Sequence, residues 1–174
     1  LFLALALGLA LVSGVSTAQS YPGRPITFVV GFAPGGGTDV TARIIGKELA
    51  ERLGQPVLVD NKPGAAAIIA TEYVAKAAPD GYTLLAAASG QMVYNPGVYS
   101  KLPYDPAKSF IPITLFNLDP LVFAVHPSVP AKTIKEYVAL ARAKPGTLFY
   151  SSAATAFQVA TEHFKKQAGV NVVY

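Results

Sequence analysis

Short apolar runs alternate with amphipathic helical patterns along this chain, and that alternation restricts the fold more than any other feature. The run Ile26–Gly31 is rich in β-branched residues, as is typical of a strand buried on both faces. A helical pattern follows over Thr38–Leu53, and the runs Val57–Val59 and Tyr82–Ala88 flank a second helical stretch that ends near Ala78. Since short connections in a βαβαβ order require right-handed crossovers, the sequence predicts an α/β fold with a parallel sheet.

A second unit of the same kind begins beyond a proline-rich connection. Prolines between Asn95 and Asp119 are expected to interrupt any helix there. Further on, the sequence predicts two helices, one beginning after Thr133 with a Thr133/Glu136 capping box and one spanning about Thr155 to Ala168. Three short strands are also expected, at Leu121–Val125, Leu148–Tyr150 and Val170–Tyr174. We therefore expect a first lobe over 19–100, a crossover or hinge region over 101–120, and the truncated beginning of a second lobe over 121–174.

Residues 1–18 form an uncharged leader that is rich in Leu and Ala and ends in small residues. This pattern predicts a signal peptide that is cleaved after Ala18, so that the exported chain begins at Gln19. A membrane anchor is the alternative, but Ser13 and Gly14 break an apolar run that would need about 20 residues to span a bilayer.

Composition excludes several classes of function. The chain has no cysteine, which rules out disulfides and thiolate metal sites within it. Its net charge is +4 and its longest basic run is Lys165-Lys166, so a nucleic-acid partner is not indicated. The two histidines, His126 and His163, have no partner at metal-ligand or triad spacing, and we expect no metal, no cofactor and no catalytic residue in this stretch.

A glycine-rich loop follows the first predicted strand and is the strongest candidate for a binding site. Parallel strands present ligands at their carboxyl ends, and free N–H groups at a helix start attract anions. Neither a P-loop nor a G-x-G-x-x-G motif is present, and the alternative is a plain turn in which Thr38 or Asp39 caps the helix. The residues predicted to cradle an anion are Phe32, Ala33, Pro34, Gly35, Gly36, Gly37, Thr38 and Asp39.

Two more loops carry small polar residues at the ends of predicted strands. Ser89 and Gly90 follow the third strand, and Ser151, Ser152 and Thr155 precede a helix in the second unit. Each loop alone is typical of a helix cap. Together, in two α/β units, they predict a ligand cleft between lobes.

Six ordered motifs resemble the beginning of Bug-type receptors, the periplasmic solute-binding proteins of tripartite tricarboxylate transporters. They are Tyr21–Ile26, Val30–Asp39, Asp60–Gly64, Ala75–Leu84, Leu102–Asp105 and His126–Pro130.

The resemblance implies a two-lobed periplasmic-binding-protein-like fold, incomplete here at its C-terminus, that closes around a small carboxylate. It implies a monomeric receptor without enzymatic activity that delivers its solute to membrane transporter subunits. Backbone groups of the first loop would hold the carboxylate, with Ser89, Gly90 and the Ser151–Thr155 loop completing the site.

The chain departs from this family pattern in three places. Ala65–Ile69 stands where Gly and Asn are usual, Gln91 follows Ser89-Gly90, and Ala153, Ala154 and Phe157 make the second-lobe loop poor in glycine. These changes imply a more apolar pocket. Two other functions stay open at this point: an α/β enzyme whose catalytic residues lie in the missing half, and an interaction domain tethered by an uncleaved leader.

Overall fold

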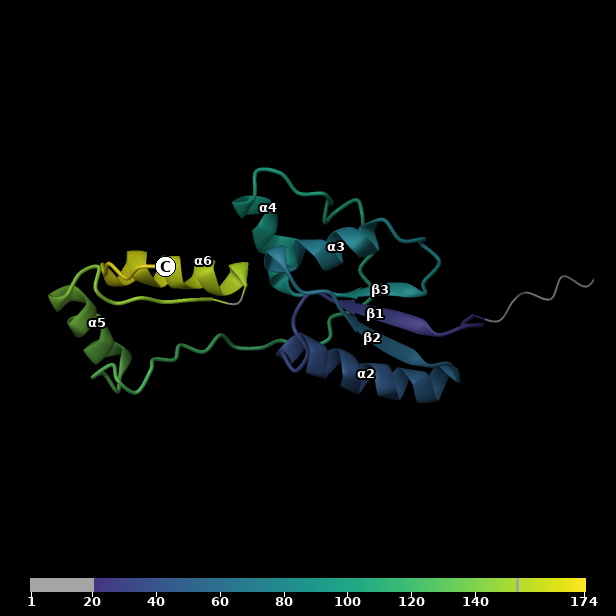
Figure 1. Ribbon diagram of the computed structural model, residues 1–174, viewed down its shortest axis with the longest axis horizontal. Helices are drawn as coiled ribbons and strands as arrows, with labels where there is room; N and C mark the ends of the chain where they lie inside the picture. Colours follow the sequence, from purple (N-terminus) through teal and green to yellow (C-terminus); the bar gives the residue numbers. More distant parts are fainter. Residues whose placement is uncertain (1–20, 153) are drawn as a thin grey trace, which may run out of the picture.

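The computed structural model describes residues 21–152 and 154–174 (Figure 1). The predicted leader and its cleavage after Ala18 therefore lie outside the described residues, as does Ala153. The elements are β1 (Ile26–Val30), α2 (Gly37–Leu53), β2 (Val57–Asn61), the 3₁₀ turn η1 (Ala65–Ala67), α3 (Ile68–Ala75), β3 (Thr83–Ala86), the π-helical turn η2 (Gly90–Tyr94), α4 (Asn95–Val98), α5 (Ile134–Ala143) and α6 (Thr155–Ala168). None of the described helices is long and apolar enough to span a bilayer.

The first unit is the predicted α/β fold. Its three strands are parallel in the order β2-β1-β3, and Phe28 lies opposite Val59 on one side and Leu84 on the other. Figure 1 shows α2 on one face of this sheet and α3 on the other. The prediction of a parallel sheet flanked by helices is confirmed.

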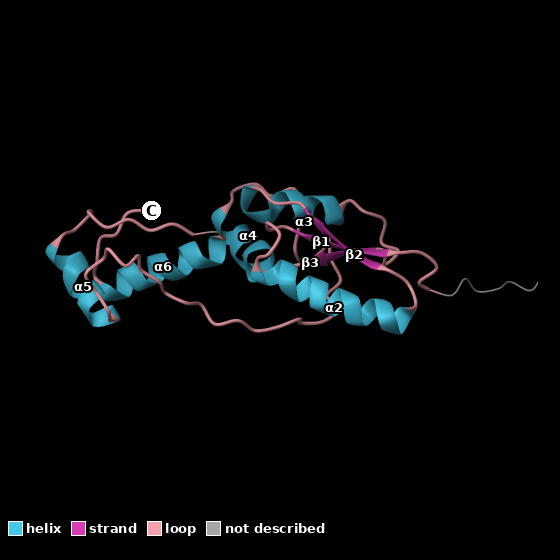
Figure 2. Cartoon of the chain, turned by 60° about the horizontal axis from the view of Figure 1, so that its bottom comes forward, coloured by secondary structure: helices cyan, strands magenta, loops and turns pink. Residues whose placement is uncertain are grey.

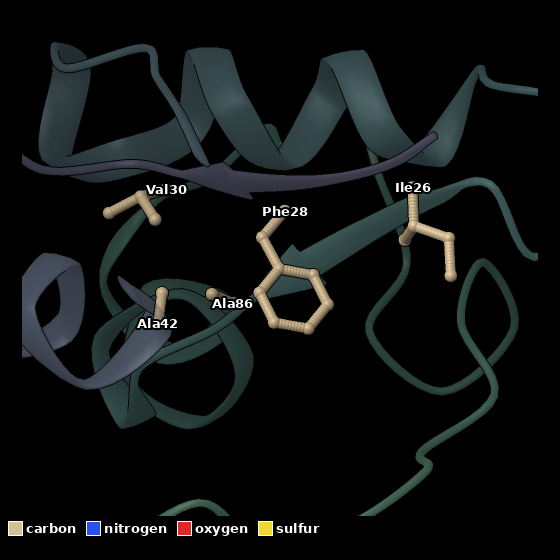
Figure 3. Packing of buried hydrophobic residues seen from close by; sticks show 5 residues of the cluster. All are labelled: Ile26, Phe28, Val30, Ala42 and Ala86. Atoms are coloured by element: carbon tan, nitrogen blue, oxygen red, sulfur yellow. The ribbon is translucent and has the colours of Figure 1, made fainter. Parts of the chain in front are cut away.

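Alternate residues of β1 build the core between the sheet and α2. Ile26, Phe28 and Val30 are at most 3% exposed and point to the side of the sheet on which Ala42 of α2 lies (Figure 3). Val29, on the opposite face, is fully buried, as expected for a central strand covered on both sides. At the end of α2, Gly54 takes a left-handed conformation with φ 66° and its N–H donates to the carbonyl of Ala50, so the helix stops where predicted.

The helix after Gly64 differs from its prediction at both ends. It begins with the 3₁₀ turn η1 and its α-helical part ends at Ala75, short of the expected Ala78. In η1, Ala65, Ala66 and Ala67 have positive φ values of 47°, 51° and 66°. These left-handed conformations are costly for residues with a Cβ, so the alanine run that departs from the family pattern is also a place of backbone strain.

Pro96 does not interrupt a helix, contrary to the prediction. It lies in the first turn of α4, where a missing N–H removes no helical hydrogen bond. The rest of the connection, residues 110–125, forms no helix or strand and runs from the sheet unit to α5 in both views (Figures 1 and 2).

The second unit contains both predicted helices. Thr133 caps α5 through its side-chain oxygen, which accepts from the Glu136 N–H at 3.2 Å, while the Glu136 carboxylate accepts from the Lys132 N–H. Its core comprises Ala131, Tyr137, Ala141, Val170 and Val172.

The strands predicted for the second unit do not form a sheet. Leu121–Val125 has no ladder partner among the described residues, so that prediction is wrong for this chain. Leu148–Tyr150 and Val170–Tyr174 meet only in one parallel bridge between Phe149 and Val173. A strand needs neighbours on its hydrogen-bonding edges, and apolar β-branched composition alone does not supply them.

Candidate functional site

The first loop is held in shape by the buried carboxylate of Asp39. This carboxylate accepts from the Gly35 N–H at 2.8 Å, from Arg43 Nε at 3.0 Å and from Asn61 Nδ2 at 2.9 Å. Asn61 Nδ2 also donates to the Phe32 carbonyl at 3.0 Å, which ties the other end of the loop to β2. Asp39, Arg43 and Asn61 thus form a brace around the loop.

The brace neutralises the negative charge of Asp39. The hydrogen bond from Arg43, followed by those from the Gly35 N–H and Asn61, lowers the pKa of Asp39 to about 2. The guanidinium of Arg43 lies 2.9 Å from Asp39 Oδ1, so the two charges cancel at this end of the helix. The carboxylate belongs to the internal bonding of the loop, and the brace leaves the charge of the loop close to neutral.

Helix α2 begins without a side-chain cap. Its N-cap is Gly36, which has no side chain, so the alternative in which Thr38 or Asp39 caps the helix is wrong. Among residues 21–152 and 154–174, no hydrogen bond to a side chain satisfies the N–H groups of Gly37, Thr38 and Asp39. Ala33, Pro34 and the three glycines are exposed, and Gly35 has φ 85°, a conformation that favours glycine. The loop therefore presents unpaired backbone donors at the positive end of a helix dipole.

The loop after β3 lies against the loop after β1. Ser89 is exposed and Gly90 begins the π-helical turn η2. The next residue, Gln91, is fully buried: its Oε1 accepts from the Ala88 N–H at 2.7 Å and its Nε2 donates to Thr71 Oγ1 at 2.9 Å. A Cβ on Gly31 would lie 3.0 Å from Gln91 Nε2 and 2.4 Å from the Cβ of Ala67, so only glycine fits at Gly31.

The described residues of the second-unit loop lie in two environments, with Ser151 exposed to solvent and Thr155 buried. Ser151 is exposed, and Ser152 Oγ lies 3.3 Å from the hydroxyl of Tyr174. Thr155, the first residue of α6, is 5% exposed, and its Oγ1 donates to Asn95 Oδ1 at 2.7 Å. Figure 2 shows this end of α6 beside α4, so the structure brings Thr155 to the sheet unit.

Two hollows in the described residues lie away from the predicted ligand-binding loops. A hollow of about 440 Å³ lies between α4 and α6, and another of about 550 Å³ lies around His126 and Lys132. Neither is lined by a residue of the three predicted loops. The loops after β1 and β3 lie at the carboxyl ends of these strands, and residues 33–37 of the first loop are exposed.

Sequence reasoning missed several polar residues that hold these loops in place. Asn61 lies in the motif Asp60–Gly64, but nothing in the motif indicated that its amide would bridge Asp39 and Phe32. Gln91 stands out in the sequence only as a departure from the family pattern, and Tyr104 only as a residue of the motif Leu102–Asp105. Tyr104 is buried and its hydroxyl donates to the Gln91 carbonyl at 2.8 Å.

Solved structures match the fold and define its class. Three structures superpose with a TM-score of 0.79 over 88% of this chain and 52–53% of their own chains. They are a periplasmic transporter at 37% identity, Rpa4515 of R. palustris with adipate at 36%, and MatC of Rhodopseudomonas palustris with bound malate at 31%. The class is thus that of α/β periplasmic solute-binding proteins.

The family follows from the sequence comparison. Residues 41–174 match the family described as tripartite tricarboxylate transporter family receptor, and the chain belongs to that family. It is also 35% identical over 159 residues to Protein BugT of Bordetella pertussis, covering 90% of this chain and 49% of BugT. The chain spans about half the length of the curated relatives it matches. Members of this family are transport receptors, not enzymes.

Proposed function

We propose that the full-length protein is a periplasmic receptor that captures a small carboxylate and delivers it to the membrane subunits of a tripartite transporter. The observation that carries this proposal is the first loop, where unpaired N–H groups meet a helix dipole and the charge of Asp39 is already neutralised. Relatives of the chain bind adipate and malate, both dicarboxylates. A linear dicarboxylate is therefore the favoured class of ligand.

The proposed ligand contacts come chiefly from backbone N–H groups. The N–H groups of the first helical turn would hold one carboxylate, since a hydrogen bond to a charged group contributes roughly 1.5–3 kcal/mol. The residues proposed for the whole site are those of the three loops: Phe32, Ala33, Pro34, Gly35, Gly36, Gly37, Thr38, Asp39, Ser89, Gly90, Ser151, Ser152 and Thr155. We propose that the receptor is monomeric, uses no cofactor, and has a hinge over 101–120 between lobes at 19–100 and 121–174.

Gly37 offers a sharp test of the backbone donors. It is the first helical residue of α2, a position that accepts proline, and Gly36 already has the extended conformation that a residue before proline prefers. Gly37→Pro removes one N–H with little cost to the helix. Gly37→Ala is the matched control, because it keeps the N–H and its Cβ would meet no atom within 4 Å.

Adipate, malate and citrate are then titrated into the full-length protein and both variants, with binding followed by calorimetry and by the ligand-dependent rise in Tm. We expect Gly37→Pro to weaken binding by about tenfold or more, while Gly37→Ala retains it. No binding of any of these acids, or of a wider panel of amino acids and aromatic acids, to the unaltered protein would contradict the proposed function. Equal binding by the two variants would contradict the role of the N–H groups.

The proposed location has its own test. Export with removal of the leader predicts that the mature protein begins at Gln19. Mass spectrometry of the intact periplasmic protein measures this directly, and retention of residues 1–18 would favour the tethered alternative.

A further inference from the structure

Five polar side chains are buried where the two units meet. Thr71, Gln91 and Asn95 are fully buried, Thr155 is 5% exposed and Tyr104 is 7% exposed. No buried side-chain N or O atom of the described residues lacks a hydrogen-bond partner. Such a network is stabilising only when it is fully satisfied, so its members restrict one another to a single arrangement.

The network runs from the sheet unit to α6 without a break. Gln91 joins Thr71 to the loop after β3, and the Gln91 carbonyl accepts from the Tyr104 hydroxyl. Asn95 Nδ2 lies 3.3 Å from the Tyr104 hydroxyl and donates to the Ala66 carbonyl at 3.1 Å. The Oδ1 of the same side chain accepts from Thr155.

The final link is the one that crosses between the units. Within residues 21–152 and 154–174, no other hydrogen bond joins the sheet unit to the α5–α6 unit. The packing beside it is incomplete, because the hollow of about 440 Å³ separates Val98 of α4 from Val159 and His163 of α6. Helix α6 also packs against η2, and among the described residues this buried hydrogen bond is the directional contact that joins it to the sheet unit.

We propose that Asn95 and Thr155 form a latch that sets the position of Thr155, at the start of α6, relative to the sheet unit. The hydroxyl proton of Thr155 is engaged by Asn95, so Thr155 serves a ligand through its backbone N–H and acts as a positioning residue. The effect of the latch on ligand affinity rests on the proposed function; its effect on the orientation of the units does not.

The chain offers a matched set of variants. Thr155→Val removes the hydroxyl at nearly constant volume, and Thr155→Ser keeps it. Thr161→Val is the control, since Thr161 Oγ1 donates to the Phe157 carbonyl at 2.8 Å inside α6 and takes no part in the junction. Asn95→Ala removes the acceptor, and the double variant with Thr155→Val tests whether the two residues act through one bond.

The first measurement is the distance between the units in the ligand-free full-length protein. Spin labels at Lys47→Cys on α2 and Lys135→Cys on α5 occupy exposed positions in a stretch that has no cysteine of its own. We expect one narrow distance distribution by pulsed electron resonance for the parent, Thr155→Ser and Thr161→Val. Thr155→Val and Asn95→Ala should broaden it, and the double variant should be no broader than either.

The second measurement is the affinity for adipate and malate. Loss of one neutral hydrogen bond should weaken binding roughly two- to tenfold in Thr155→Val, with recovery in Thr155→Ser. A distance distribution in Thr155→Val that equals that of Thr161→Val would overturn the latch, whatever the affinities. If neither acid binds the parent or any variant but the distance distribution broadens in Thr155→Val, the latch is supported and the proposed function is contradicted. Should Thr155→Val fail to fold, Thr155→Ala and Asn95→Ala decide the same question.

Discussion

The sheet unit and the α5–α6 unit begin from similar sequence patterns and reach different degrees of order. In the sheet unit, β1 has a hydrogen-bonded neighbour on each side and a helix over each face, and its inward residues are almost completely buried. In the α5–α6 unit, two helices pack on a small core and the strand segments share a single bridge. The comparison teaches that an apolar run becomes a strand only where the chain also supplies a partner strand that pairs with it along several residues.

Phe28→Ala against Phe149→Ala tests this contrast with the largest expected effect. Phe28 is 3% exposed in the first core, whereas Phe149 is 75% exposed beside the lone bridge. Removing the buried ring should lower the free energy of unfolding by about 3–5 kcal/mol, and removing the exposed one by less than about 0.5 kcal/mol. Chemical denaturation of the full-length protein measures both. Similar losses would show that Phe149 is covered there by a part of the protein absent from this chain, and would break the contrast.

Residues 19–174 alone should not fold cooperatively. The connection exposes Ile111, Ile113 and Leu118 by 76–90%, and the outer strands β2 and β3 have no further strand partner among the described residues. Exposed apolar surface and open edges favour aggregation, so we expect this segment to aggregate or to remain molten. Light scattering and a thermal melt followed by near-UV circular dichroism are the measurements. A cooperative transition of a monodisperse sample would contradict the prediction.

The brace predicts a pH dependence specific to the sheet unit. The pKa of Asp39 is about 2 in the folded protein, below its ordinary 3.8, so the brace stabilises the fold fully above pH 3.8. This contribution is lost as the pH falls from about 3.8 through about 2. Asp39→Asn should therefore lower stability at pH 6 and flatten its decline between pH 4 and pH 2. Urea unfolding across this range measures the effect, with Asp119→Asn in the exposed connection as control. If stability declined equally steeply with falling pH in both variants, Asp39 would not account for the pH dependence.

The smallest expected effect is a gain of stability in η1. Ala66 has φ 51°, and Ala66→Gly relieves this left-handed strain, although it also increases the entropy of the unfolded chain. We expect a net gain of about 1 kcal/mol or less, measured as a rise in Tm. Ala160→Gly within α6 is the opposing control, because glycine in a helix interior is destabilising by roughly 1 kcal/mol. A loss in Ala66→Gly as large as in the control would show that η1 carries no strain.

The sequence predicted the elements better than the contacts among their side chains. Apolar periodicity located β1, α2 and α6 closely, because burial of a strand or helix face follows from local pattern. It failed for Leu121–Val125, since pairing depends on distant segments, and for Pro96, since helix starts tolerate proline.

In the candidate site, too, the position of the elements could be predicted from the sequence and the side-chain contacts could not. The position of the first loop followed from the order of strand and helix, and its role as an anion cradle stays a prediction. The amide of Asn61, the burial of Gln91 and the partnership of Thr155 with Asn95 join residues 20 to 60 positions apart. No local pattern encodes such contacts, so they emerge only when the chain is folded.

The neutral brace also bears on the kinetics of solute exchange. An uncompensated cation in the loop would draw anions from a distance and make their arrival fall steeply with salt. Here the positive charge of Arg43 is balanced by the negative charge of Asp39. What remains at the loop is the helix dipole and its N–H groups, whose field acts at short range. If the loop binds a carboxylate as proposed, the brace itself adds little long-range attraction, and its contribution to the rate of arrival should depend only weakly on ionic strength. Under the proposed function, release would likewise not be opposed by a net charge at the loop, as delivery to a transporter requires.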